Sequence, residues 1–314
     1  MNNSPAFAIS LDDLAVLRAS GVDAADFLHG QLTQDITGLP PGSARLAAYC
    51  TPKGRVLATL IIMRDPDCTD DLLALVKADI APSLVKRLSM FVLRAKAKLE
   101  VSSLRVVGVD SASGSTDNSV SLTPPAGAAP WSVVKNDQGI WISAPAAEDS
   151  GHRWWLIAGS EASIPSPEHE LSAWQAADIE AGLPWIETAT QDVFIPQTLN
   201  LDLIDGVNFT KGCYPGQEVV ARSHYRGTVK RRMAYGIALT NNTPAAGTDI
   251  YDAARPESPS GRIINAATRE GRTHLLLEVH LSEMSTAQYR VGSADGTPIV
   301  LHPLPYSIEH KEEA

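Results

Sequence analysis

Short apolar runs separated by polar turns mark the first 110 residues, and their spacing predicts a mixture of helix and strand. In VDAADFLHGQLTQDI, Asp23 is a suitable N-cap and apolar residues from Phe27 to Leu32 recur at helical spacing, which predicts a short amphipathic helix. In LAAYCTPKGRVLATLIIMR, two β-rich runs flank a Thr-Pro-Lys-Gly turn at residues 51–54. Proline at the second turn position and glycine at the fourth predict a hairpin there.

The following runs extend this mixed pattern. DLLALVKADI predicts a strand, APSLVKRLSMFVL a helix, and KAKLEVSSLRVVGV one or two strands, an order of elements found in α+β sandwiches. Residues 110–130 lack aromatic residues and are rich in serine, proline, alanine and glycine, which predicts a long surface connection. WSVV, IWISA and HRWWLIAG then predict strands, and PEHELSAWQAADIEAG predicts a helix that Gly182 and Pro184 end.

The pattern changes at Arg231. MAYGIALT, GTDIYDA, GRIINAA, THLLLEVHL and TPIVLHPLPYS are short β-rich runs at close spacing with turn residues between them. Such a series predicts an all-β unit. We therefore expect residues 1–230 and 231–314 to form separate structural regions.

Composition bounds the class of protein. With 44% hydrophobic and 20% charged residues among 314, the chain has the make-up of a water-soluble globular protein. The beginning MNNSPAFAISLDDLAVL lacks a basic segment followed by an apolar one, and the longest apolar run, LIIM, is too short to cross a bilayer. Cys50, Cys68 and Cys213 form an odd set without CxxC spacing, as expected in a reducing compartment. These features predict a cytoplasmic protein that does not enter membranes.

Charge argues against one class of partner. The net charge of −10 disfavours broad nonspecific binding to nucleic-acid backbones, because that binding depends on neutralising phosphates. We therefore expect no direct, stable nucleic-acid binding. One basic run without an intervening acid stands out, at Arg222, Arg226, Lys230, Arg231 and Arg232. It is either a solvated helix end followed by an exposed strand edge, or an anion site.

Several common functional motifs are absent. The sequence has no GxGxxG, GxxxxGK[ST], GxSxG or HExxH, so it offers no signature of a dinucleotide site, a P-loop, a serine hydrolase or a zinc protease. Three cysteines cannot by themselves supply the four thiolates of a common iron–sulfur cluster. His274 and His280 are interpreted as ordinary surface or packed residues. We expect no bound metal.

The stretch KGCYPGQEVVAR places Cys213 between glycines and a proline. Pro215 suits the first turn of a helix running through GQEVVARSHYR, which would put Cys213 just before a helix N-terminus. The helix dipole and Lys211 would then favour the reactive thiolate. The alternative is a structural cysteine, since free cysteine is among the most buried residue types.

KGCYPGQE closely resembles the signature KGCYxGQE of the YgfZ family of folate-binding proteins, which are relatives of the glycine-cleavage aminomethyltransferase (T-protein). The resemblance continues through IEAGLPWIETATQDVFIPQTLNLDLIDGVNFT, VVARSHYRGTVKRR, FLHGQLTQDI, YCTPKGRVL and LHPLPYSIE. It covers essentially the full length and is weakest between about residues 105 and 165.

This resemblance implies a function and a fold. The function is that of a cytoplasmic, tetrahydrofolate-binding accessory protein for the assembly or repair of iron–sulfur enzymes, with client proteins such as tRNA methylthiolation enzymes. The fold is an α+β, three-lobed ring around a central folate site. Two interlocked α+β lobes, the second at roughly residues 45–110, would precede a C-terminal β-barrel at 231–314. We expect a monomer.

The resemblance also implies site residues. Cys213 would be the functional thiol, with Lys211 beside it. Trp174 would stack on the pterin, and Glu180 would accept hydrogen bonds from its amino-pyrimidinone edge, a task suited to a carboxylate. Because Glu180 lies at a helix C-terminus, the unfavourable end for an acid, we expect a partner to compensate it. Further residues assigned to the folate site are Leu14, Tyr214, Gln217, Glu218 and Arg222.

Two departures from the family pattern limit which properties of the family can be expected of this chain. Leu14 stands where other members have a tryptophan at the folate, so one stacking wall is apolar but not aromatic. Ala58 and Thr59 stand where aminomethyltransferases have an Asp-Asp pair that contains the catalytic carboxylate. The chain is therefore not expected to be an active aminomethyltransferase. Two alternatives stay open: a folate-dependent one-carbon transferase with a different base, and a folate-stabilised scaffold without chemistry.

Overall fold

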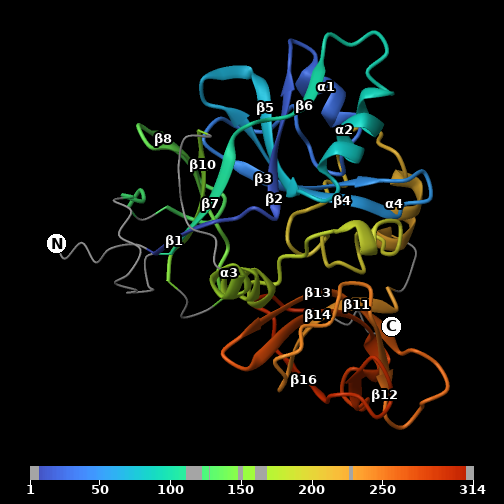
Figure 1. Ribbon diagram of the computed structural model, residues 1–314. Coiled ribbons are helices and arrows are strands. Elements are labelled where there is room, and N and C mark those ends of the chain that lie inside the picture. Colours follow the sequence, from blue (N-terminus) through green and yellow to red (C-terminus); the bar gives the residue numbers. More distant parts are fainter. Residues whose placement is uncertain are drawn as a thin grey trace.

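The computed structural model of the protein describes residues 7–110, 122–126, 128–147, 151–159, 168–225 and 229–308. Within these ranges the chain forms three antiparallel sheets and four α-helices (Figure 1). The long connection expected at residues 110–130 lies largely outside the described residues, which omit 111–121 and 127.

The first sheet combines the start of the chain with its middle. Its strands, in spatial order, are β1 (Phe7–Ser10), β7 (Arg105–Asp110), β10 (Arg153–Ala158), β9 (Gly139–Ser143) and β8 (Val133–Asn136). The strands expected around the tryptophans of IWISA and HRWWLIAG are therefore present.

The second sheet is built from the residues between β1 and β7. Its strands, in spatial order, are β3 (Ala44–Cys50), β4 (Val56–Asp65), β5 (Cys68–Lys77), β2 (Leu14–Ser20) and β6 (Lys98–Val101). The chain thus starts in the first sheet, builds the second and returns to the first. The expected β3–β4 hairpin is present, and its turn is closed by a 2.8 Å bond from Gly54 N to Thr51 O.

Two short helices accompany the second sheet, α1 (Ala24–His29) and α2 (Ala81–Ser89). Asp23 precedes α1 but makes no capping bond with its side chain. Its carboxylate instead accepts a 2.6 Å hydrogen bond from the backbone of Lys96. The expected helix is therefore present, but Asp23 ties it to the loop before β6.

The third sheet begins at Arg231, where the sequence pattern changes. Its strands, in spatial order, are β15 (Tyr289–Val291), β12 (Asp249–Asp252), β13 (Gly261–Arg269), β14 (Arg272–His280), β11 (Arg231–Ala238) and β16 (Ile299–His302). The expected barrel is a half-barrel sheet with β15 and β16 as its edges. These edges approach through an isolated bridge between Arg290 and Pro298. The division into domains and lobes remains a prediction.

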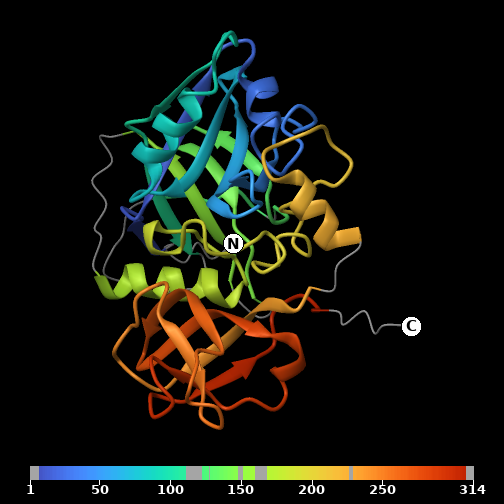
Figure 2. The same ribbon diagram turned by 90° about the vertical axis from the view of Figure 1, so that its right-hand side faces the viewer.

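The helix α3 (Glu168–Glu180) lies between the half-barrel and the two other sheets (Figures 1 and 2). It packs on β13 and β14 and also contacts β1. One buried apolar cluster includes Trp155 of the first sheet, Leu75 of the second, Trp174 of α3 and Leu276 of the third. This shared core fixes the three sheets around α3.

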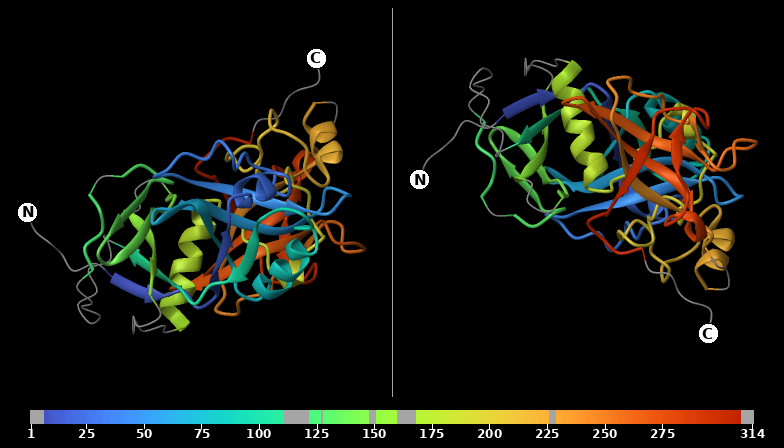
Figure 3. Two further views of the ribbon diagram at one scale, coloured as in Figure 1. Left: turned by 90° about the horizontal axis from the view of Figure 1, so that it is seen from above. Right: turned by 90° about the horizontal axis from the view of Figure 1, so that it is seen from below.

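The remaining helices complete the described structure. They are α4 (Gln217–Tyr225), the 3₁₀ turn η1 (Thr188–Thr190) and the 3₁₀ turn η2 (Leu281–Glu283). Seen from above and from below, α4 lies at the opposite end of the molecule from β1 (Figure 3). None of the helices in the described ranges has the length and apolar character needed to cross a membrane.

Candidate functional site

A small cavity lies where the second sheet and the half-barrel meet α3, and we call it the inner cavity. Its volume is about 40 Å³. Its lining residues come from the start of β2, the end of β5, α3, the segment after α3, and β13: Asp13, Leu14, Lys77, Trp174, Gln175, Asp178, Ile179, Trp185, Glu187, Asn265 and Ala266. Two expected folate residues, Leu14 and Trp174, are therefore brought together although they are far apart in the sequence.

The inner cavity adjoins a larger outer cleft. The cleft has a volume of about 560 Å³ and shares Asp13, Lys77, Gln175, Glu187 and Ala266 with the inner cavity. We refer to the two spaces together as the central site. Its size lies in the range of small-molecule pockets.

Asp13 is the hub of the polar contacts in the central site. Its Oδ2 accepts hydrogen bonds from Lys77 Nζ at 2.7 Å and from Gln175 Nε2 at 2.8 Å. Lys77 Nζ also lies 3.7 Å from Glu187 Oε1. Burial alone would lower the pKa of the Lys77 ammonium, but the two carboxylates outweigh burial and raise it. Lys77 is therefore held as a cation between two acids.

Glu187 is the second carboxylate near the Lys77 ammonium. Its Oε1 accepts a 3.1 Å hydrogen bond from Asn265 Nδ2, which ties the segment after α3 to the half-barrel. Burial raises the pKa of the Glu187 carboxyl, and the Lys77 charge opposes that change. The central site therefore holds carboxylates whose protonation a bound ligand can influence.

Trp174 lies beneath a buried ion pair. The Arg153 guanidinium sits 4.0 Å from the centre of the Trp174 ring and bonds Asp178 at 2.7 Å. Trp185 Nε1 donates to the second oxygen of Asp178 at 3.0 Å. Burial raises the pKa of Asp178, while Arg153 opposes the change. The ring of Trp174 is thus held in place and one of its faces is already covered.

Two buried polar atoms at the central site have no hydrogen-bond partner in the part of the chain that the structure describes, Asp13 Oδ1 and Trp174 Nε1. A buried polar atom without a partner costs free energy, about 1 to 3 kcal/mol, unless a water or ligand satisfies it. One atom is an acceptor and the other a donor. Both residues line the inner cavity, so these two atoms are candidates for polar contacts with a ligand.

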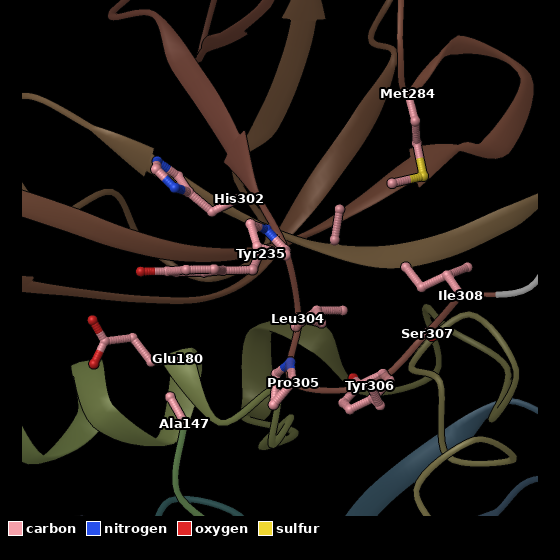
Figure 4. A pocket seen from close by; sticks show the side chains of 12 residues that line it. Ala147, Glu180, Tyr235, Met284, His302, Leu304, Pro305, Tyr306, Ser307 and Ile308 are labelled. Atoms are coloured by element: carbon pink, nitrogen blue, oxygen red, sulfur yellow. The ribbon is translucent and has the colours of Figure 1, made fainter. Parts of the chain in front are cut away.

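Glu180 lies away from the central site. Six positions separate it from Trp174, and at 3.6 residues per turn this spacing puts it on a different face of α3. It lines a separate cavity of about 790 Å³ together with Tyr235, His302 and Tyr306 (Figure 4). The two expected pterin contacts therefore do not share one cavity.

The compensating partners expected for Glu180 are present. Its Oε1 accepts a 2.6 Å hydrogen bond from Arg269 and lies 3.3 Å from His274 Nδ1. His274 is buried and pairs with the Tyr235 hydroxyl at 2.8 Å. Burial lowers the pKa of His274, and the Glu180 charge opposes this. Glu180 thus joins α3 to the half-barrel.

The signature loop, residues 211–218, is fixed by its lysine. Lys211 Nζ donates to the carbonyl oxygens of Leu32, at 2.7 Å, and of His29, the last residue of α1. It also lies 5.0 Å from the centre of the Tyr214 ring. Burial lowers the pKa of Lys211 to about 8. The loop is therefore anchored to α1.

A second anchor joins the signature loop to the β3–β4 hairpin. Gly216 has a left-handed φ of +82°, and a Cβ there would lie 2.5 Å from Thr51 O and 2.7 Å from Gly54 Cα. Only glycine fits so close an approach. The two stretches YCTPKGRVL and KGCYPGQE, which both carried the family resemblance, are thus neighbours.

Cys213 is exposed. The position of the following helix differs from the expectation, because α4 begins at Gln217 and Pro215 precedes it in a turn. Gly216, which lies between Pro215 and Gln217, has a left-handed φ and therefore cannot belong to the α-helix. Cys50 is buried, which raises its thiol pKa to about 12. Cys68 is exposed but is the first residue of β5 rather than part of a loop.

The other signature residues have different environments. Tyr214 is buried, Gln217 is half-buried, and Glu218 is exposed. Glu218 accepts a hydrogen bond from Arg222 one helical turn later. The lining of the central site includes none of these four residues.

Three arginines of the basic run after the signature loop pair with three different acids in the described structure. Arg222 pairs with Glu218, Arg231 with Glu278, and Arg232 with Asp202 at 2.5 Å. Arg226 lies outside the described residues. Since these three arginines already have carboxylate partners, the structure does not support the anion-site interpretation. Among the described residues, no cluster of histidine, cysteine, aspartate and glutamate has a geometry that could hold a metal.

Ala58 and Thr59 lie in β4 and are completely buried. Thr59 Oγ1 accepts a 3.0 Å hydrogen bond from Ile186 N. Neither residue lines the central site. The acids that line the central site are instead Asp12, Asp13, Asp79, Asp178 and Glu187, which motif reasoning missed. The sequence did contain one signal for this site: Lys77 is a charged residue directly after the apolar run LLALV.

The fold is of the glycine-cleavage aminomethyltransferase type. The structure superimposes on the crystal structure of glycine cleavage system aminomethyltransferase T from Bartonella henselae with a TM-score of 0.68, covering 96% of this chain and 86% of that one at 13% identity. No family model matches the chain.

Sequence comparison is more specific. The chain is 30% identical to the tRNA-modifying protein YgfZ of Yersinia pestis over 97% of its own length and 93% of the relative. It is 31% identical to an uncharacterized protein of Haemophilus influenzae, over 96% and 98%. The chain belongs to the YgfZ family.

Proposed function

We propose that the chain is a tetrahydrofolate-binding accessory protein for the assembly or repair of iron–sulfur enzymes, including those that thiolate tRNA, with Cys213 as its functional thiol. The name of the Yersinia pestis relative supports a role in tRNA modification. The observation that carries the proposal is an exposed thiol on an anchored loop.

The loop geometry suits work on a large partner. Because Cys213 is exposed, a macromolecule can reach it without local unfolding. Because Lys211 and Gly216 fix the loop on both sides, the thiol keeps its position when a partner approaches. A structural cysteine needs neither property, as the buried Cys50 illustrates.

The central site fits a reduced folate. A pterin presents adjacent donors and acceptors along its amino-pyrimidinone edge, which match the unpartnered Asp13 Oδ1 and Trp174 Nε1. Leu14 adds an apolar wall, and Glu187 adds a second carboxylate. The inner cavity has a volume of about 40 Å³, so the outer cleft would take most of the ligand. Bound tetrahydrofolate supplies nitrogen atoms that carry one-carbon groups.

A second candidate function is favoured by one observation. Asp13 places a carboxylate oxygen without a hydrogen-bond partner in the described structure at the central site, so a base other than the missing Asp-Asp pair is available for one-carbon transfer. A glycine-cleavage assay with the partner proteins separates the two functions. Turnover comparable to that of an authentic T-protein would favour the transferase.

The proposed function is tested by complementation. A bacterial strain that lacks its own relative would receive the wild-type chain, Cys213→Ser or Cys68→Ser, and mass spectrometry would give the methylthiolated fraction of tRNA nucleosides. We expect wild type and Cys68→Ser to restore methylthiolation, and Cys213→Ser to restore less than about a tenth of it. Equal restoration by Cys213→Ser would remove the role of the thiol.

A further inference from the structure

Four large, exposed apolar side chains belong to two neighbouring connections at one end of the second sheet. The exposed fraction is 66% for Val22, 62% for Met90, 48% for Phe91 and 89% for Leu93. The turn after β2 and the loop between α2 and β6 lie side by side there (Figures 1 and 2). We call Val22 and residues 86–98 the tip. It lines neither the central site nor the cavity at Glu180.

The backbone of the tip is held by hydrogen bonds. Phe91 N donates to Leu88 O at 2.9 Å, and Ala95 N donates to Val92 O at 2.8 Å. Lys96 and Asp23 bond each other through Lys96 N and the Asp23 carboxylate at 2.6 Å. Leu93 itself has a left-handed φ of 40°, which is unfavourable for a leucine. The tip therefore presents its apolar groups on a preformed backbone, which reduces the entropy lost on binding.

The loop between α2 and β6 is rich in positive charge, while Asp23 and Asp26 follow Val22 on the other side of the tip. The sequence between Asp79 and Glu100 contains no acid. Lys86, Arg87, Arg94 and Lys96 are exposed, and Lys98 pairs with Glu100. The whole chain carries a net charge of −10, so the tip has the opposite sign to the molecule. A partner with carboxylates around an apolar pocket would complement this surface.

The tip and the signature loop lie at the two ends of one short helix. Val22 immediately precedes the N-cap of α1, and His29 at the other end of α1 accepts the hydrogen bond from Lys211. A helix of six residues is about 9 Å long. Because this distance is small compared with the size of a protein, a protein bound at the tip can extend over α1 to Cys213.

We infer that the tip is the docking surface for the client protein, which presents an apolar pocket rimmed by aspartate and glutamate, and that docking brings the client to Cys213. This inference rests on the proposed function. Protein is favoured over RNA because Phe91 is the single aromatic residue of the tip, whereas single-stranded RNA is bound through several stacking rings. A membrane is disfavoured because the apolar face of α2, with Leu84 and Leu88, is buried in the protein.

Binding measurements test the inference. The probe is a purified tRNA methylthiolation enzyme, and its dissociation constant is measured by calorimetry with the wild-type chain, with Phe91→Ser/Leu93→Ser, and with Leu239→Ser. Leu239 is the control because its side chain is 77% exposed on the third sheet's side of the molecule, away from the tip. We expect the tip variant to bind at least ten times more weakly and Leu239→Ser to bind like wild type. Circular dichroism would confirm that all three are folded.

The outcomes separate this inference from the proposed function. Equal binding by the tip variant, or no binding by wild type, would overturn docking at the tip. So would tip-dependent binding of purified tRNA or of phosphatidylglycerol vesicles in place of the enzyme. In each case the complementation result for Cys213→Ser still tests the proposed function independently. If Cys213→Ser restores methylthiolation while the tip variant loses enzyme binding, docking survives and the role of the thiol does not.

Discussion

Trp174 shows what one side chain contributes to the candidate ligand site. The indole lies below Arg153, and a Cβ added at Gly108 would come within 2.6 Å of its Cε3 atom. The ring is therefore tightly packed by the protein itself. What it still offers is the N–H at its edge, which has no partner among the described residues. In the proposed folate site, Trp174 would therefore contact the pterin through its N–H rather than by stacking.

Replacing that N–H is the sharpest test at the residue scale. Trp174→Phe keeps an aromatic ring against Gly108 but removes the donor, so tetrahydrofolate affinity should fall by about 1 kcal/mol, roughly fivefold. Calorimetry measures this change. Trp141→Phe is the control, because Trp141 Nε1 bonds Asn136 at 2.8 Å in the first sheet. Equal folate affinity in wild type and Trp174→Phe would exclude the contact.

Lys211 gives a prediction about pH. Burial lowers its pKa in the folded chain to about 8, whereas lysine in an unfolded chain titrates near 10.4. Between these values the unfolded chain binds the proton that the folded chain has released, so raising the pH favours the folded state. This contribution is complete above the unfolded pKa and is lost as the pH falls through about 8.

The comparison is between wild type and Lys211→Met. The variant should be less stable because the carbonyls of His29 and Leu32 lose their donor. The stability difference should grow as the pH rises from about 8 toward 10. Urea unfolding at several pH values measures it. A difference that stays constant or shrinks over this range would contradict the burial of the ammonium.

At the scale of elements, local pattern predicted what local forces determine. The β3–β4 hairpin follows from its Pro-Lys-Gly turn, and α3 ends before the left-handed Gly182 as expected. The start of α4 was misplaced because Pro215 suits a first helical turn, whereas contact with the hairpin forces Gly216 into the left-handed region. The hairpin belongs to another part of the chain, so a local sequence pattern cannot predict its contact with Gly216.

The contact between Gly216 and the hairpin can be tested with a matched pair of glycines. Gly216 and Gly292 both have positive φ, +82° and +74°, but a Cβ at Gly292 would meet nothing within 4 Å. Alanine at either position costs about 1 kcal/mol through the backbone. Gly216→Ala should cost a further 1 to 3 kcal/mol, roughly, because the loop must move away from Thr51.

Chemical denaturation gives both stabilities, and complementation gives the consequence for function. Gly292→Ala should restore tRNA methylthiolation like wild type, while Gly216→Ala should restore less because Cys213 is displaced. Equal losses of stability in the two variants would show that the close approach of the hairpin is not what requires glycine at position 216.

At the scale of the whole molecule, the central site exists only because the second sheet and the half-barrel meet at α3. Asp13 and Leu14 belong to the second sheet's side, Trp174 to α3, and Asn265 to the half-barrel. Family resemblance identified Leu14 and Trp174. Asp13, which is remote in sequence from its partners and part of no motif, could be assigned only after the sheets were placed. The same placement separated Glu180 from Trp174.

This architecture makes a thermal prediction. A ligand that binds the folded chain alone stabilises it by about 2.7 kcal/mol at a concentration 100 times its dissociation constant, which corresponds to a rise of about 5 °C in melting temperature. The central site joins the second sheet, α3 and the half-barrel, and the first sheet shares a buried core with them. Tetrahydrofolate should therefore shift the unfolding of the whole chain as one transition. Scanning calorimetry with and without tetrahydrofolate measures this shift in melting temperature. Lys77→Met should reduce the shift, because it removes the cation that lies between Asp13 and Glu187. Two transitions of which folate moves just one would place the ligand within a single region, such as the cavity at Glu180, rather than where the sheets meet.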